Sequence, residues 1–240
     1  PLSYITEGAV YGRHILATTP DAKIGVLFVA DDFGRDSLKG LKAGLGDKAA
    51  KLIVAETSYD NTDATIDSQI IKLQAAGADA VVNFSTPKFA AMAIRKFSEM
   101  KWKPAHYLTS VSQSVGGVLA PAGLDNSVGI LSAYYAKDPD DPAMANDPGL
   151  KRWQSFMDKY MPGADRRNTF HVYGYNLAQT LEKLLRQCGD DLTRENIMRQ
   201  AEHLDLELDM LLSGMRLTTS PTDHNPVKQT RLRRFDGARW

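Results

Sequence analysis

Short apolar runs alternate with helical patterns through the first half of the chain, and this alternation restricts the folds that it can form. The runs favour strands, and they cover 23–30, 52–56, 79–84, 105–109 and 128–134. Helical patterns fall between them; after the first run, Leu38, Leu41 and Leu45 recur at helical spacing. Units of strand, helix and strand connect by right-handed crossovers. The sequence therefore predicts an α/β fold with a mostly parallel sheet.

The pattern changes after Tyr135. A loop rich in Pro and Asp covers 137–149. Three helices are predicted beyond it, the first carrying Trp153 and Tyr160, the second over 172–187, and the third capped by Thr193. The chain then returns to a strand pattern at 214–219 and 227–235, which predicts an antiparallel hairpin around a turn with two prolines.

The composition excludes several classes of protein. The chain has 29 Lys and Arg against 29 Asp and Glu, so it lacks the basic excess of a nucleic-acid binder. The longest apolar run, 24–30, is far shorter than the roughly 20 residues of a membrane-spanning helix. A single cysteine, Cys188, forms neither an internal disulfide nor a cysteine-based zinc site. Since the chain starts at Pro1 and not at Met, we expect a processed product or a fragment.

No motif indicates catalysis. The chain has no Gly-x-Gly-x-x-Gly, no phosphate-binding loop and no Gly-x-Ser-x-Gly elbow. Its five histidines are scattered, without a second histidine at ligand spacing. The sequence therefore predicts a protein that is not an enzyme and that has no cofactor and no metal site.

A binding site is expected at one edge of the predicted sheet, because open parallel sheets bind ligands outside the carboxyl ends of their strands. Four segments meet that description: 31–34, 85–87, 110–113 and 134–135. Ser85 and Thr86 are interpreted mainly as helix caps that can also line a pocket. Asp31 and Asp32 are adjacent and point to opposite sides, which favours a solvated turn over a carboxylate pair.

The run from Asp21 to Asp36, DAKIGVLFVADDFGRD, resembles the start of the second lobe of the leucine/isoleucine/valine-type periplasmic solute-binding proteins of ABC importers. These are type I extracellular ligand-binding receptors. The similarity spans essentially the whole chain. It continues at 67–70, 77–79, 86–89, 173–175 and 235–237.

The resemblance implies a Rossmann-like lobe of a type I periplasmic-binding-protein fold, in which two lobes close on a solute by hinge motion. Residues 1–134 and 208–240 would form the second lobe. Residues 135–207 would be a helical segment of the first lobe, most of which is expected before Pro1.

The implied function is a periplasmic or extracytoplasmic solute-binding subunit. Its partners would be a small solute and the membrane subunits of an importer, with no nucleic acid and no direct insertion into the membrane. The alternative is the ligand-sensing domain of a receptor or regulator with the same fold.

The resemblance also implies the site residues. Phe33 matches a position that packs on the ligand, and Ser85 and Thr86 match the turn after the third strand. Asp32 and Tyr134 lie at the same edge. Amino-acid binders place an acidic residue near the position of Ser110 and Val111, where this sequence has no carboxylate. A buried ammonium group without a counter-charge is costly. We therefore expect an aromatic or other organic acid as the solute, in preference to a branched-chain amino acid.

Overall fold

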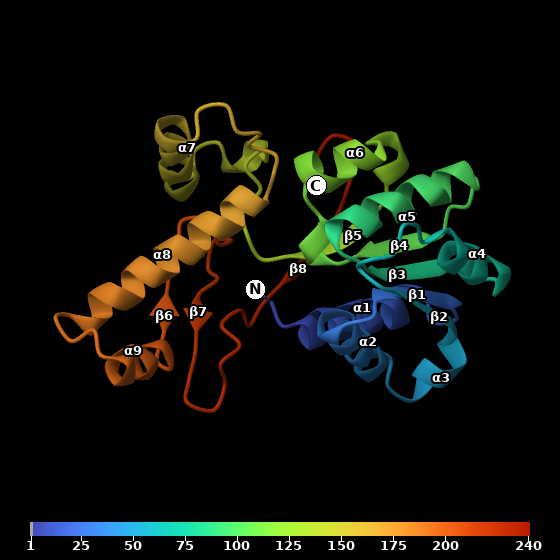
Figure 1. Ribbon diagram of the computed structural model, residues 1–240, viewed down its shortest axis with the longest axis horizontal. Coiled ribbons are helices and arrows are strands. Elements are labelled where there is room, and N and C mark those ends of the chain that lie inside the picture. Colours follow the sequence, from blue (N-terminus) through green and yellow to red (C-terminus); the bar gives the residue numbers. More distant parts are fainter. Residues whose placement is uncertain (1) are drawn as a thin grey trace. The chain divides into compact units, whose positions relative to one another are not determined.

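The computed structural model describes residues 2–240, and its contacts group into two compact units (Figure 1). The sheet unit comprises Ser3–Ala133 and Leu232–Trp240. The helical unit comprises Leu2 and Tyr134–Arg231. The chain therefore passes between the units at three places, after residues 2, 133 and 231.

A six-stranded sheet has the order β2-β1-β3-β4-β5-β8. The strands are β1 (Ile24–Val29), β2 (Ile53–Tyr59), β3 (Ala80–Phe84), β4 (Ala105–Leu108), β5 (Leu131–Tyr134) and β8 (Arg231–Arg234). β1 pairs in parallel with β2 and β3, and the pairs β3–β4 and β4–β5 are also parallel. The mostly parallel α/β sheet predicted from the sequence is thus confirmed. Because β1 lies between β2 and β3, the carboxyl ends of these strands mark the point where such sheets bind ligands.

Helices cover both faces of this sheet (Figure 1). They are α1 (Tyr4–Thr18), α2 (Asp32–Leu45), α3 (Ala49–Leu52), α4 (Asp67–Ala75), α5 (Pro87–Glu99) and α6 (Ala120–Ala122). Short turns of helix occur at η1 (Gly46–Lys48), η2 (Ser110–Ser112), η3 (Val115–Leu119) and η4 (Asp125–Ser127). One core cluster joins Leu27 and Val81 of the sheet to Ile70 of α4 and Phe89 of α5. None of the helices in residues 2–240 is both long enough and apolar enough for a membrane crossing.

Four glycines let α1 and α2 approach closely. Gly8 and Gly12 lie one turn apart on α1, and Gly40 and Gly44 lie one turn apart on α2. A Cβ atom added to Gly12 would lie 2.7 Å from the carbonyl oxygen of Leu41. At the other three glycines it would lie closer still to a carbonyl oxygen of the facing helix. The separation of the two helices is therefore set by bare backbone.

The helical unit contains η5 (Pro142–Met144), α7 (Pro148–Tyr160), α8 (Phe170–Cys188) and α9 (Arg194–Ala201). It also contains the antiparallel pair β6 (Asp205–Leu206) and β7 (Leu217–Thr218). Its core joins Leu150, Trp153 and Met157 of α7 to Val172 of α8. The predicted cap of α9 is confirmed, because the side chain of Thr193 accepts a hydrogen bond from Asn196 N.

The predicted hairpin of 214–219 with 227–235 is confirmed only beside its turn. Antiparallel bridges join Leu217 to Val227 and Ser220 to Asp223. Beyond Val227 the described residues do not continue this pairing, and β7 pairs with β6. Residues 231–234 form β8 beside β5 in the main sheet. Phe235, which follows β8, is fully buried in a core cluster of the sheet unit. Burial of this large apolar side chain favours the main sheet over a local hairpin.

We expect Gly8→Ala and Gly40→Ala each to lower the free energy of unfolding by about 1–3 kcal/mol, the usual cost of overpacking a close contact. Denaturant unfolding of each variant measures this change. Gly174→Ala is the control, since nothing lies within 4 Å of a Cβ at that helical position. Alanine there should raise stability by up to about 1 kcal/mol through helix propensity. Equal effects at the three positions would contradict the close contact of α1 with α2.

Candidate functional site

Tyr59 ties the carboxyl end of β2 to that of β3. Its buried hydroxyl accepts a hydrogen bond from Thr86 N (2.9 Å) and lies 3.2 Å from Thr86 Oγ1. Thr86 Oγ1 in turn donates to Asn61 Oδ1 (3.2 Å). Burial raises the pKa of Tyr59, so its hydroxyl keeps its proton and donates it to Thr86 Oγ1. The loop after β3 is therefore held by uncharged hydrogen bonds.

The interpretation of Ser85 and Thr86 as side-chain caps is wrong. Thr86 occupies the N-cap position of α5, but its side chain makes no capping hydrogen bond. Pro87 begins the helix, and proline has no N–H group that would need a cap at this position. Within the described residues, Ser85 Oγ is buried and makes no hydrogen bond. Neither hydroxyl therefore caps α5, and that of Thr86 bonds to Tyr59 and Asn61 instead.

The loop after β4 includes Ser110 and Val111, both partly exposed. Ser112 Oγ donates to the carbonyl oxygen of Ser85 (2.6 Å), which joins this loop to the loop after β3. Glu7 of α1 contacts Ser110 twice: Oε1 accepts from Ser110 N and Oε2 accepts from Ser110 Oγ, each at 2.6 Å. A carboxyl group therefore does lie beside Ser110, contributed by a residue 103 positions earlier.

The carboxyl group of Glu7 is buried and is not exposed at the carboxyl edge of the sheet. Only 2% of the residue is exposed, and its third contact is with the hydroxyl of Tyr11 (2.8 Å). Burial is the largest influence on Glu7 and raises the pKa of its carboxyl, while the two hydrogen bonds donated by Ser110 oppose this rise.

Three residues that follow β1, Asp31, Asp32 and Phe33, have different surroundings. Asp31 accepts a hydrogen bond from Gly34 N (3.1 Å) and caps α2. The side chain of Asp32 is 99% exposed and pairs with Arg35 at 3.1 Å, so it is solvated as predicted, but Asp32 begins α2 and does not lie in a turn. Phe33 is partly buried, and its ring centroid lies 4.6 Å from that of Tyr4 in an edge-to-face arrangement.

Tyr134 is the last residue of β5, is partly exposed and belongs to the helical unit. Its carbonyl oxygen accepts a hydrogen bond from Thr230 Oγ1 (2.8 Å). Within the sheet unit, a hydrogen bond from Ser112 joins the loop that contains Ser110 to the loop that contains Ser85 and Thr86. Further hydrogen bonds join Thr86 to Tyr59 and Ser110 to Glu7.

Three residues that help to build this edge, Tyr4, Glu7 and Tyr59, were not predicted. One signal for Glu7 was present in the sequence. Glu7, Tyr11 and Ile15 recur at a spacing of four on α1, on the face that also carries Gly8 and Gly12. A carboxyl residue on such a buried stripe needs hydrogen-bond partners inside the fold.

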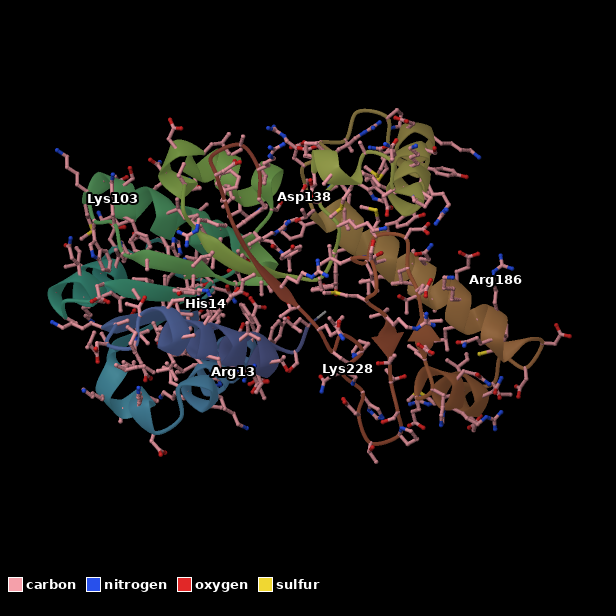
Figure 2. All side chains as sticks on the ribbon, turned by 180° about the vertical axis from the view of Figure 1, so that it is seen from behind. Arg13, His14, Lys103, Asp138, Arg186 and Lys228 are labelled. Carbon is pink, nitrogen blue, oxygen red and sulfur yellow. The ribbon has the colours of Figure 1, made fainter. Side chains whose placement is uncertain are left out.

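Two of the five histidines, His106 and His14, contact polar side chains within the fold. His106 is buried, its Nε2 lies 3.2 Å from Asn83 Nδ2, and burial lowers its pKa to about 3. His14 of α1 (Figure 2) places Nδ1 3.0 Å from the Tyr107 hydroxyl. Within residues 2–240, no three His, Cys, Asp or Glu side chains are grouped so that they could hold a metal ion.

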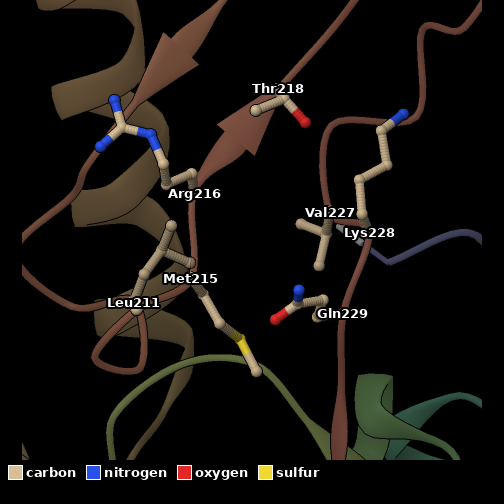
Figure 3. Close-up of a pocket in the computed structure, with 8 residues that line it drawn as sticks. Leu211, Met215, Arg216, Thr218, Val227, Lys228 and Gln229 are labelled. Atoms are coloured by element: carbon tan, nitrogen blue, oxygen red, sulfur yellow. The ribbon is translucent and has the colours of Figure 1, made fainter.

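A pocket of about 250 Å³ in the helical unit (Figure 3) has none of the residues predicted to bind a ligand in its lining. Leu211, Met215 and Val227 supply apolar walls. Its two cationic residues are already paired: Arg216 with Asp205 and Glu207, and Lys228 with Asp223. These pairings leave little charge to attract an anion.

We expect Tyr59→Phe to lower the free energy of unfolding by about 1–3 kcal/mol, because it removes the acceptor of the partly buried N–H of Thr86 and the hydrogen bond to Thr86 Oγ1. Chemical denaturation checks this value. Tyr160→Phe is the control: Tyr160 is 60% exposed on α7, and the change should stay within about 0.5 kcal/mol. A Tyr59→Phe protein as stable as the control would show that the hydroxyl does not hold the β3 loop.

Comparisons with a family model and with solved structures agree on one family. The model of a family described as periplasmic binding protein matches residues 2–239. A substrate-binding periplasmic protein from Ralstonia solanacearum has 22% identity and a TM-score of 0.76, with 100% of this chain and 66% of that chain covered. A search of curated proteins finds no match.

Two further solved structures share the fold at lower identity. A possible leucine/isoleucine/valine-binding protein from Rhodopirellula baltica SH 1 has 19% identity and a TM-score of 0.81, covering 99% of this chain and 63% of its own. A branched chain amino acid ABC transporter from Thermus thermophilus, with bound valine, has 16% identity and a TM-score of 0.82, covering 98% of this chain and 63% of its own. This chain thus spans 63–66% of the length of these three structures. With the match over residues 2–239 and the shared α/β fold, the chain belongs to the periplasmic binding protein family, as its resemblance to that family predicted.

Proposed function

We propose that this chain is part of the solute-binding subunit of an ABC-type importer, located in the periplasm or otherwise outside the cytoplasm. The observation that carries the proposal is the carboxyl edge of the sheet. Hydrogen bonds between the loops after β3 and β4 gather hydroxyl groups at the place where doubly wound sheets bind ligands. The protein would carry a solute to the importer's membrane subunits and would catalyse no reaction.

The solute would contact the residues inferred from the sequence. These are Asp32, Phe33, Ser85, Thr86, Ser110, Val111 and Tyr134. The partly exposed ring of Phe33, supported by Tyr4, would supply an aromatic contact. The three passages of the chain between the units agree with a hinge, which closure around a solute requires.

An aromatic or other organic acid is the solute class that we favour. An amino acid would need a counter-charge for its ammonium group. The carboxyl group nearest Ser110 is that of Glu7, which is buried and has both oxygens in hydrogen bonds. A branched-chain amino acid is the competing solute, since one structure of this fold contains valine.

Calorimetry on the protein with both lobes tests the solute class. Benzoate and other aromatic acids should bind, and leucine and valine should give no heat of binding. Phe33→Ala should weaken the binding of aromatic acids about tenfold through the lost ring contact. Phe156→Ala, which changes an exposed ring of α7 in the helical unit, is the control and should not alter affinity. Tight leucine binding without binding of aromatic acids would overturn the proposal.

We also infer that residues 135–207 belong to the other lobe. Helix α8 supports this assignment. One side of the helix is packed in the core of the helical unit through Val172, with Tyr175 against it. A second side exposes large apolar residues at intervals of three or four positions: Phe170, Tyr173, Leu177, Leu181 and Leu185. An exposed stripe of this kind is typical of a surface that packs against further protein.

This chain alone should therefore self-associate through the α8 stripe. Sedimentation should show a mass that rises with concentration, and the double substitution Leu177→Lys and Leu181→Lys should lower it toward the monomer. Leu192→Lys, at an exposed position beyond α8, is the control and should leave association unchanged. A monomer at all concentrations would argue against a docking role for the stripe.

A further inference from the structure

The hydroxyl of Tyr11 is inserted between two strands at the candidate site. β4 and β5 are parallel, with Leu108 opposite Ser132. The hydroxyl lies 2.7 Å from the carbonyl oxygen of Leu108 on β4, and it accepts a hydrogen bond from Ala133 N on β5 (2.9 Å). It thus links two main-chain groups of neighbouring strands. Its third neighbour is Glu7 Oε1, at 2.8 Å.

The protons around this hydroxyl can be counted. A phenol has one proton to donate, and the carbonyl oxygen of Leu108 can only accept. At 2.7 Å that contact is a full O–H···O hydrogen bond, so it takes the proton of Tyr11. The contact between Tyr11 and Glu7 Oε1 has the length of a second full hydrogen bond. Its proton must then come from Glu7.

An ionised Glu7 does not satisfy the same contacts. If Tyr11 gave its proton to the carboxylate, its oxygen and that of Leu108 would face each other at 2.7 Å with no proton between them. A neutral Glu7 leaves no such pair. Oε1 donates to Tyr11 and accepts from Ser110 N, while Oε2 accepts from Ser110 Oγ.

The surroundings of Glu7 agree with this count. The groups that face its carboxyl are Tyr11 from α1 and Thr109 and Ser110 from the β4 loop, and Tyr11 is the titratable one among them. The contacts recorded for Glu7 within residues 2–240 include no cation. Burial raises the pKa of Glu7, and it raises that of Tyr11 well above its ordinary value, so both groups tend to keep their protons.

We propose that Glu7 is a positioning residue that acts as a neutral acid, holding Ser110 in place and joining the β4 loop to α1 and β5. Its role in solute binding rests on the proposed function. Both donors of Ser110 are engaged by Glu7, so Ser110 offers a solute acceptor lone pairs and no proton. Glu7 adds no negative charge to the site and is not a counter-charge for an ammonium group.

Infrared difference spectroscopy at pH 7 tests the protonation without any solute. The spectrum of the wild-type protein should contain a carbonyl band of a protonated carboxyl group that is absent from Glu7→Gln. Glu99→Gln, which removes an exposed carboxyl of the same unit, should leave that band in place. If Glu7→Gln does not fold, titration of the ¹³C-labelled glutamates of the wild type gives the same answer. One glutamate should then titrate above the others, and its absence would overturn the neutral acid.

The pH dependence of stability has a defined sign. A carboxyl whose pKa is raised on folding contributes stability that is complete below its unfolded pKa and is lost as the pH rises through its folded pKa. The stability of the wild type relative to Glu7→Gln should therefore fall as the pH is raised above about 4.5. A difference that grew with pH would show that the ionised form is the one that the fold stabilises.

The positioning role has its own measurement. Hydrogen exchange of the Ser110 amide should become about tenfold faster or more in Glu7→Ala, because the amide loses its acceptor and the loop opens locally. Glu99→Ala is the control and should leave that rate unchanged. Unchanged exchange in Glu7→Ala would overturn the positioning role. Since neither readout uses a solute, a wrong solute class would leave both results standing.

Discussion

The close approach of α1 to α2 is the contact on which the rest of the sheet unit depends. Four glycines remove the side chains that would separate the two helices, and backbone oxygens fill the space. A helix held this close has little freedom to shift along its partner, since any lateral movement brings backbone atoms into collision. The position of α1 then fixes where Glu7 and Tyr11 meet the sheet, because both lie on the buried face that carries Gly8 and Gly12.

Two buried tyrosines, Tyr59 and Tyr11, form similar hydrogen bonds to the main chain at the carboxyl edge of the sheet. Tyr59 comes from the end of β2 and accepts from the amide of Thr86, in the loop after β3. Tyr11 comes from α1 and accepts from Ala133 N, while it also contacts Leu108 O. In each case a phenol bonds to main-chain groups at or just beyond the ends of strands. A side chain that bonds to the backbone in this way holds a loop in place without sealing the edge with another strand.

The regular part of this fold was predictable, and the reasons are local. Strands such as 24–29 and 80–84 are continuous apolar runs, and Thr193 caps a helix through a neighbour three positions away. The hairpin forms only beside its turn, because Phe235 packs in the core of the sheet unit among residues that are distant in the sequence. The side chain of Thr86 does not cap α5, because its hydroxyl bonds to Tyr59 and Asn61, which lie more than twenty positions earlier in the sequence.

The candidate site was predictable only in part, for the same reason. Its loops follow from the rule that parallel strands end at one edge, but their partners come from elsewhere in the chain. Glu7 shows the limit most clearly: inspection of the segment around Ser110 finds no carboxylate, and the carboxyl arrives from a helix at the start of the chain. Its chemistry also depends on that placement, because the same residue on an exposed helix face would be charged.

The loops at the carboxyl edge of the sheet are held together differently from the polar side chains of the helical unit. The helical unit contains close ion pairs, such as Lys137 with Asp147 at 2.6 Å and Arg152 with Asp209 at 2.5 Å. At the sheet edge, the loops after β3 and β4 are held by hydroxyl, amide and carbonyl groups together with Glu7. A neutral Glu7 makes this second set free of net charge. A solute there would then be selected by shape, by aromatic contact and by the direction of single hydrogen bonds. A formal charge on the solute would have to be met by dipoles or by groups outside these loops, because an uncompensated buried charge is too costly to hold.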